Sequence, residues 1–290
     1  MAQLIQMRQR IQAAESTKKI TQAMRLISMS THSRLRAKKE QLQAYRQAFD
    51  KLFRRLSYLQ PAQVAVQGQE RHLIILVSSN KGLCGNFNAQ LFKFFEQESG
   101  SPDNLSNSTH DFIGVGRYAA NYLHEHNFVT LANYTTFMSL QFTHIANALT
   151  DIILSGAVSY TTVTVYSTYA KSFFIQRPQK TQLIPAASLA QELTQEEQEI
   201  QLQQAQSQDY ILESSAEELG SLLYKLMLSI ILQELLFESL LAEQAARFLS
   251  MDSATRNADN LIADMRLEYN KTRQAEITRE LTELSSSYTV

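Results

Sequence analysis

The chain has 290 residues, 44% of them hydrophobic, and a formal net charge of −1. This length suits two domain-sized units, or one domain plus an elongated element, and it allows a substantial core. Cys84 is the only cysteine, which excludes an intrachain disulfide and a cysteine-based metal site and suits a reducing compartment.

Charge is strongly segregated along the chain. Residues 1–60 carry thirteen Lys or Arg against three acids, whereas residues 186–220 carry eight acids and no Lys or Arg. A basic arm of this kind suits nucleic acid, anionic lipid or an acidic protein surface, and it is equally compatible with a solvated helix face. Arg8 and Arg10 stand where a signal peptide would have its apolar segment, so we expect no signal peptide.

Residues 3–59 are predicted to form one long helix, because neither Gly nor Pro occurs until Pro61. Apolar residues recur at coiled-coil spacing, and we predict that they form the seam. Around Thr17-Lys18-Lys19 this seam is expected to slip, passing from Ile11 to Ile20. The predicted seam consists of Leu4, Ile11, Ile20, Met24, Ile27, Leu35, Leu42, Tyr45, Phe49, Leu52, Leu56 and Leu59.

Between residues 70 and 186 the hydrophobic period changes. Continuous or alternating apolar runs predict strands, and three amphipathic stretches between them predict helices. Strands alternating with helices favour a small doubly wound α/β domain with a mostly parallel sheet. The strands are expected at 72–79, 111–116, 161–168 and 171–184, and the helices near 87–97, 117–126 and 136–156. Residues 187–208 form an acidic, Gln- and Glu-rich connection.

Residues 209–290 predict a second long helix, of about 75 residues and about 110 Å. Its charged residues argue against a membrane span. Its seam is expected to slip between Tyr269 and Ile277, across Lys271-Thr272-Arg273-Gln274. The two terminal helices are each other's natural partners in a long antiparallel coiled coil. The last helix would overhang the first by roughly 25 Å, and another protein must surround that overhang.

The turn Ser79–Asn86 lies between a buried strand and a helix, where many α/β proteins bind phosphate. Gly82 and Gly85 give only G-x-x-G, so a tight turn that needs positive φ is the favoured interpretation. Cys84 has no evident catalytic partner, and the six histidines lack metal-ligand spacing. The sequence therefore predicts no catalytic, metal or cofactor site.

Three segments resemble one known family. Asn260–Leu284 (NLIADMRLEYNKTRQAEITRELTEL), with Met251–Ala258 before it, closely resembles the C-terminal helix of the γ subunit of F-type ATP synthases. Ile11 with Thr17–Met24 (TKKITQAM) is similar to that family's N-terminal signature, and Leu76–Asn88 (LVSSNKGLCGNFN) to its strand–turn–helix motif. The three segments occur in the family's order, and together with the matching long terminal helices the resemblance covers essentially the whole chain.

The resemblance implies a rotor whose paired helices pass through a ring of α and β subunits. The α/β domain would lie outside that ring, near the ε subunit and the membrane-embedded c-ring. Membrane association would come only through the complex, at the cytoplasmic face of a bacterial or archaeal plasma membrane, and nucleic acid would not be a partner. By correspondence, Arg273, Gln274 and Thr278 would contact β near its catch region, together with Met24 and Lys19 of the first helix. None of these residues would be catalytic.

The sequence also departs from the family. Thr31 stands where lysine is common, and the usual apolar tip is replaced by Ser285–Val290. The cysteine pair of the chloroplast redox loop is absent. These departures hint at an alternate F-type enzyme.

Two other functions remain open at this point. One is a stand-alone nucleotide-binding protein that uses Asn80–Asn86 and dimerises through its helices. The other is a basic coiled-coil adaptor for nucleic acid, against which the acidic 186–220 segment argues.

Overall fold

The computed structural model describes residues 2–55, 71–100, 109–137, 141–155, 160–184 and 215–287. The predicted acidic connection, 187–208, lies outside these ranges. The chain divides into two compact units. We name Met1–Ser30 with Arg247–Val290 the helical unit, and Thr31–Ala246 the sheet unit. Each is described by itself.

Both predicted terminal helices form, and residues 56–59, 209–214 and 288–290 of the predicted ranges lie outside the described residues. Helix α1 runs from Ala2 to Arg55, and helix α7 from Ala216 to Ser287. Each contributes one stretch to the helical unit and another to the sheet unit, so the division between units falls within the helices. Uninterrupted helices of 54 and 72 residues are possible because neither contains proline, and Gly220 is the only glycine in either.

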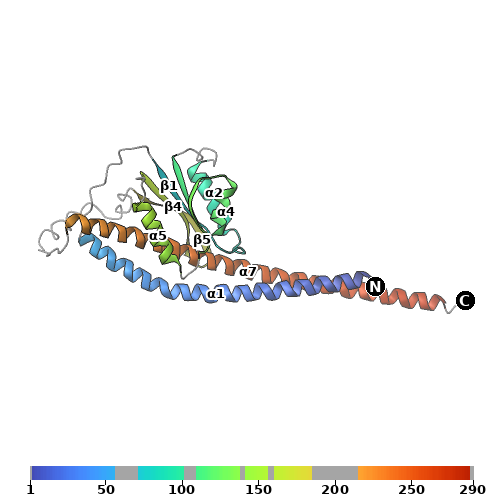
Figure 1. Ribbon diagram of the computed structural model, residues 1–290. Coiled ribbons are helices and arrows are strands. Elements are labelled where there is room, and N and C mark those ends of the chain that lie inside the picture. Colours follow the sequence, from blue (N-terminus) through green and yellow to red (C-terminus); the bar gives the residue numbers. More distant parts are fainter. Residues whose placement is uncertain are drawn as a thin grey trace. The chain divides into compact units, whose positions relative to one another are not determined.

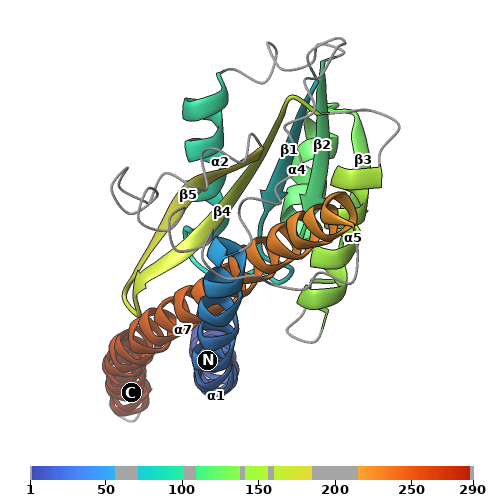
Figure 2. The same cartoon turned by 90° about the vertical axis from the view of Figure 1, so that its left-hand side faces the viewer.

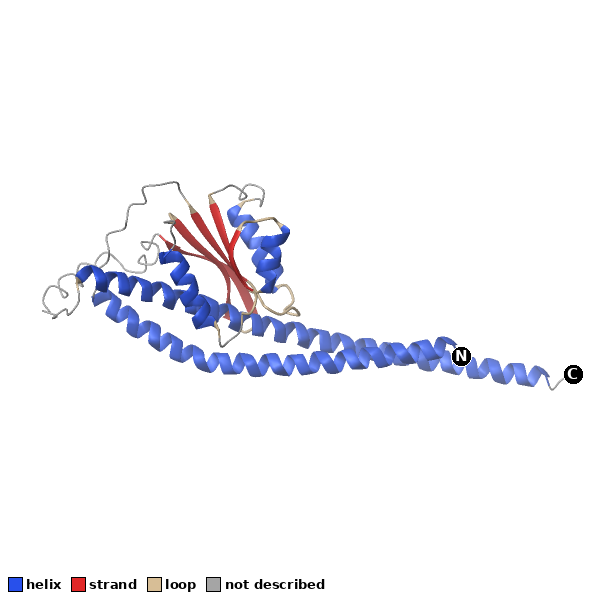
Figure 3. Cartoon of the chain, in the orientation of Figure 1, coloured by secondary structure: helices blue, strands red, loops and turns tan. Residues whose placement is uncertain are grey.

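The sheet unit holds the predicted, mostly parallel sheet (Figure 3). Its strand order is β3-β2-β1-β4-β5, in which β1 to β4 are parallel and β5 is antiparallel to β4. The reversal of order between β1 and β4 makes the fold doubly wound, which confirms the predicted class. The strands are β1 (His72–Val77), β2 (His110–Val115), β3 (Thr130–Tyr134), β4 (Thr162–Ser172) and β5 (Ile175–Ile184).

Helices cover both faces of the sheet (Figures 1 and 2). Helices α2 (Phe87–Ser99) and α4 (Arg117–Glu125) bury an aromatic-rich cluster on one face. On the other face, α5 (Phe142–Ser155) and the first part of α7 enclose the larger apolar core. That core also includes Leu35 and Phe49 of α1. Helices α1, α5 and α7 therefore share one apolar core with this face of the sheet.

The most apolar 18-residue window of α7 is long and apolar enough to cross a membrane by length and composition alone. The charged residues of α7, which were expected to argue against a membrane span, leave this window within the length and composition of one. Within the structure 56% of the window is buried. A helix at the centre of its own domain passes the same test, so the window is weak evidence for a membrane span.

Candidate partner-contact surface

In the helical unit, the α1 side of the seam is a regular heptad with no slip. The residues that turn toward α7 are Leu4, Met7, Ile11, Ala14, Lys18, Thr21, Arg25 and Ser28, all buried or half-buried. The predicted step from Ile11 to Ile20 was wrong, because Ile20 is 60% exposed. Polar side chains such as Lys18 and Arg25 occupy seam positions here, whereas neighbouring apolar side chains such as Ile20 are exposed.

The α7 side is equally regular. Its half-buried and buried positions are Met251, Thr255, Ala258, Ile262, Met265, Tyr269, Thr272 and Glu276. Each is three or four residues from the next, so the predicted slip between Tyr269 and Ile277 was also wrong. Ile277 is 48% exposed and lies off the seam. The heptad repeat continues through Thr272 and Glu276, so polar residues occupy positions that are usually apolar in a coiled coil.

Polar contacts join the two helices across this seam. Thr255 donates a hydrogen bond to the hydroxyl of Thr21, at 2.9 Å between oxygens. Arg25 pairs with Asp252 at 2.8 Å. Further along, Lys18 pairs with Asp259, and Arg266 with Glu15. The Arg25–Asp252 and Lys18–Asp259 pairs share one antiparallel register, since each pair of residue numbers sums to 277 (25 + 252 and 18 + 259).

The last turns of α7 extend past the first helix (Figure 1). In this register Ala2 lies opposite residue 275, and α7 continues twelve residues further, to Ser287. At 1.5 Å per residue this gives about 18 Å, somewhat less than the predicted 25 Å. Every residue from 277 to 285 is exposed. Ile277, Leu281 and Leu284 form an exposed apolar stripe there.

Exposed apolar side chains also mark the outer face of α1. They are Ile5, Ile20, Leu26, Ile27 and Met29. Scattered surface leucines need no explanation, but a narrow helix pair with this many large apolar residues outside its seam is suited to burial by other chains.

The five predicted contact residues all lie in the helical unit. Arg273, Gln274, Thr278 and Lys19 are exposed, and Met24 is half-buried. The Thr278 hydroxyl donates to the backbone carbonyl of Gln274, at 2.9 Å. Within the part of the chain that the structure describes, the charged groups of Arg273 and Lys19 have no hydrogen-bond or ion-pair partner. Both cations are therefore available to another protein.

The structure does not bring these five residues into one cluster. Lys19 follows Lys18, which pairs with Asp259, and Arg273 lies fourteen residues beyond Asp259 on α7. Fourteen residues of helix correspond to about 21 Å. The candidate surface thus has two levels, one around Lys19 and Met24 and one around Arg273, Gln274 and Thr278.

The predicted turn in the sheet unit is a packed structural element. Gly85 has φ of 58° and Leu83 has φ of 64°, as a tight turn with positive φ requires. Cys84 and Phe87 are buried against Ala242 and Ala246 of α7. Asn88 accepts a hydrogen bond from the backbone N–H of Ser79 and donates one to its hydroxyl, at 3.1 and 2.8 Å. The turn fastens the end of β1 to α7.

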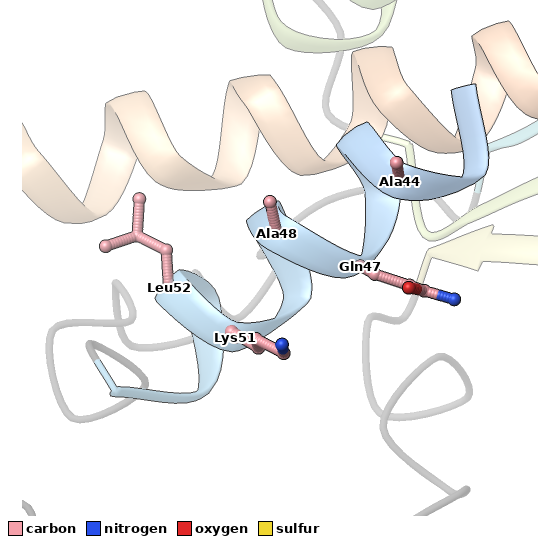
Figure 4. Close-up of a pocket in the computed structure, with 5 residues that line it drawn as sticks. All are labelled: Ala44, Gln47, Ala48, Lys51 and Leu52. Atoms are coloured by element: carbon pink, nitrogen blue, oxygen red, sulfur yellow. The ribbon is translucent and has the colours of Figure 1, made fainter. Parts of the chain in front are cut away.

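Other features of the sheet unit have structural roles. His126 stacks beside Tyr122, with ring centroids 4.5 Å apart. No group of three or more His, Cys, Asp or Glu residues within the described ranges is arranged to hold a metal. A shallow groove on α1 is lined by Ala44, Gln47, Ala48, Lys51 and Leu52, all from one helix (Figure 4). Two small residues one turn apart create this groove, which has no converging polar groups.

The interhelical ion pairs were missed by sequence reasoning. Lys18 and Arg25 are seven residues apart, as are Asp252 and Asp259, so the heptad spacing of opposite charges was visible in the sequence. The prediction assigned the seam from apolar residues alone, so it treated Lys18 as part of an interruption and did not use Arg25, Asp252 or Asp259.

A doubly wound domain and an antiparallel helix pair that exposes large apolar side chains and the cations Lys19 and Arg273 suit a subunit of a larger assembly. A family model described as ATP synthase matches residues 3–289. The ATP synthase gamma chain of Granulibacter bethesdensis is 31% identical over 310 residues, covering 99% of this chain and 98% of that protein. That of Amoebophilus asiaticus is 28% identical over 288 residues, covering 96% and 94%.

Solved structures show the same fold. A chain in the cryo-EM structure of the Euglena gracilis mitochondrial ATP synthase aligns with a TM-score of 0.65 at 15% identity, covering 99% of this chain and 94% of that one. The rotor of the same enzyme in another rotational state aligns with a TM-score of 0.60 at 16% identity, covering 95% and 99%. The chain belongs to the family of γ subunits of F-type ATP synthases.

Proposed function

We propose that this chain is the central shaft of an F-type ATP synthase. It couples ion translocation through the membrane sector to ATP synthesis or hydrolysis at sites carried by the β subunits. One observation supports this most directly: every residue from 277 to 285 of α7, in the stretch that extends past α1, is exposed, and this stretch carries an apolar stripe. Such a stripe is stabilised only when other chains surround it.

The proposed partners differ between the terminal helices and the α/β domain. The α and β subunits of the ring enclose the helices, 1–60 and 209–290, and the ε subunit and the c-ring meet the domain at 70–186. The chain itself catalyses nothing and takes no cofactor. It is a peripheral component that reaches the cytoplasmic face of the plasma membrane only through the complex, and it does not bind nucleic acid.

The free cations explain how the shaft would act on the ring. Lys19 and Arg273 carry charge that the described chain does not neutralise. An arginine guanidinium pairs bidentately with carboxylates, so an acidic loop of a β subunit suits Arg273. As the asymmetric shaft turns, each β subunit meets these groups in a different orientation. Each orientation favours a different conformational state of its catalytic site.

The experiment is a substitution in the assembled complex. Arg273→Ala with Gln274→Ala should lower ATP turnover of the complex several-fold while α and β still co-purify with the chain. Arg279→Ala is the matched control, because Arg279 lies two turns away and is engaged with Glu283 of its own helix. Turnover that is unchanged in the double variant, or equally reduced in the control, would overturn the assignment of these residues. Failure of α and β to co-purify with the unaltered chain would overturn the function.

The rival nucleotide-binding function has no support from the comparisons. The turn on which it rests is filled by its own packing, since a Cβ atom added at Gly82 would lie 2.5 Å from the Tyr118 hydroxyl. A nucleotide titration of the isolated chain should show no saturable binding.

A further inference from the structure

The helical unit contains a row of opposite charges that the proposed function does not by itself require. Along α1 the row is Glu15, Lys18 and Arg25, and along α7 it is Arg266, Asp259 and Asp252. Each member has its partner on the other helix. The Thr21–Thr255 hydroxyl contact lies between the Lys18 and Arg25 pairs.

These contacts replace much of the apolar seam expected of a coiled coil. From residue 251 to residue 285 of α7, only Met251, Thr255 and Ile262 are buried. On α1, Ser28 is the only buried residue of the helical unit's described side chains. Apolar burial along this stretch of α1 therefore comes mainly from half-buried side chains, and the polar contacts add to that modest attraction.

The polar row is also specific for one register. If α7 were shifted by one heptad in one direction, Lys18 would face Arg266. Shifted in the other direction, Glu15 would face Asp259. Each shift keeps one opposite-charge pair, Arg25 with Asp259 or Lys18 with Asp252. Each also loses the other pair and creates a like-charge contact, and both shifts separate Thr21 from Thr255. Charges arranged in this way select a single pairing of two helices, as flanking charges do in coiled coils.

A second guanidinium partner of Asp252 extends the row along α7. Arg256, one turn further, pairs with the other oxygen of Asp252 at 2.6 Å. Asp252 thus receives two guanidinium groups, one from each helix. A carboxylate held in this way is a better anchor than a single exposed pair, because its side-chain position is already fixed by the intrahelical contact.

We propose that Glu15, Lys18, Thr21 and Arg25, with Arg266, Asp259, Thr255 and Asp252, form an electrostatic clamp that keeps the N-terminal part of α1 closed on α7. The clamp makes the two helices move as one body. The idea that the clamp helps the two helices transmit torque rests on the proposed function. The clamp itself does not depend on that function. Because the attraction is ionic and partly exposed, it weakens as salt rises.

Pulsed electron-spin distance measurements on the full-length isolated chain test the clamp. Spin labels are placed at Gln6 and Asn270, which are exposed and lie beyond the clamp. Their residue numbers sum to 276, so in the register of the ion pairs they lie nearly opposite each other. Cys84, the only native cysteine, is replaced by Ser. The unaltered pair should give one narrow distance distribution that broadens in 1 M NaCl, where the Debye length is about 3 Å.

The decisive variant is Lys18→Glu, which sets a carboxylate against Asp259. It should shift the distribution to longer distances and broaden it, and Asp259→Lys in the same chain should restore the narrow peak. Lys19→Glu is the matched control, since it makes the same charge change one residue away, at a side chain without a partner in the described chain. It should leave the distribution unchanged.

An unchanged distribution in Lys18→Glu would overturn the clamp, as would an equal shift in Lys19→Glu or a failure of Asp259→Lys to restore the peak. None of these results touches the proposed function, which is tested by assembly with α and β. Conversely, a chain that does not assemble with the ring subunits can still show the clamp.

Discussion

One helix, α7, lies in two very different environments. In the sheet unit, sixteen of the twenty residues from 227 to 246 are buried, because the sheet, α5 and α1 cover the helix from several sides. In the helical unit, three of the thirty-five residues from 251 to 285 are buried. The sheet unit completes its own apolar core, whereas the helical unit has a thin seam supplemented by ion pairs and leaves many of its large apolar side chains exposed.

The two units therefore obtain their stability from different interactions. The sheet unit should fold without partners, since its core is closed on both faces of the sheet. The helical unit gains little from apolar burial alone and should depend on salt and on whatever surrounds it. Substitutions in the two units therefore separate the two sources of stability.

The largest effect is expected in the sheet unit. Phe237→Ala removes a side chain that is 1% exposed and packs beside Phe142, with ring centroids 5.5 Å apart. Loss of a buried phenylalanine costs about 3–5 kcal/mol, so the denaturant midpoint of the sheet unit should fall sharply. Leu281→Ala, at a residue 62% exposed, is the control and should leave that midpoint unchanged. Equal effects of the two substitutions would contradict the contrast between the units.

A smaller effect is expected from Asp252→Ala in the helical unit. This change removes the partner of both Arg25 and Arg256. Partly exposed ion pairs contribute about 0.2–1 kcal/mol each, so local opening should become easier by about 1 kcal/mol. Hydrogen exchange should report this as a roughly fivefold loss of protection for amides of residues 250–262, since 1.4 kcal/mol is a factor of ten. Sheet amides that lost protection to the same extent would show a global rather than a local effect.

The smallest effect is a gradual dependence on pH. Burial, and secondarily the charge of Arg36, lowers the pKa of His32, which packs edge-on against Phe173 with ring centroids 4.9 Å apart. The pKa of His110 is lowered too, chiefly by burial and then by His72. A histidine whose pKa is lower in the folded state binds fewer protons there than when unfolded. Stability should therefore fall as pH drops below 6.5 toward the lowered pKa values.

His32→Gln separates the two histidines. It removes one titrating group and should flatten part of the decline in unfolding free energy between pH 7 and pH 5, leaving the part due to His110. A decline as steep as that of the unaltered chain would show that His32 contributes nothing to it.

Most of the fold could be predicted from the sequence. The buried run at Leu73–Val77 and the alternating run at Thr162–Thr168 specified a parallel sheet, and the absence of proline specified two long helices. The predicted bounds of α5 began too early, because residues 136–137 precede the helix that starts at Phe142.

The seam was less predictable, for a physical reason. Periodicity locates the buried face of a helix only when burial happens within the chain. In the helical unit Ile20, Ile27 and Ile277 are exposed, and Lys18, Arg25 and Thr272 occupy the seam. Apolar residues meant for other chains are indistinguishable, in one sequence, from apolar residues meant for the partner helix. The same error accounts for Tyr45 and Leu52, which were assigned to the seam in the sheet unit and are also exposed.

The central proposal, that this chain is a turning shaft, is tested most directly by single-molecule rotation. The complex of the chain with α and β subunits is fixed by its ring to a surface, and a bead is attached to a cysteine introduced at Lys93, an exposed residue of α2. On addition of ATP, the bead should rotate in one direction in discrete steps. A bead that stays still while the same complexes hydrolyse ATP would contradict the account.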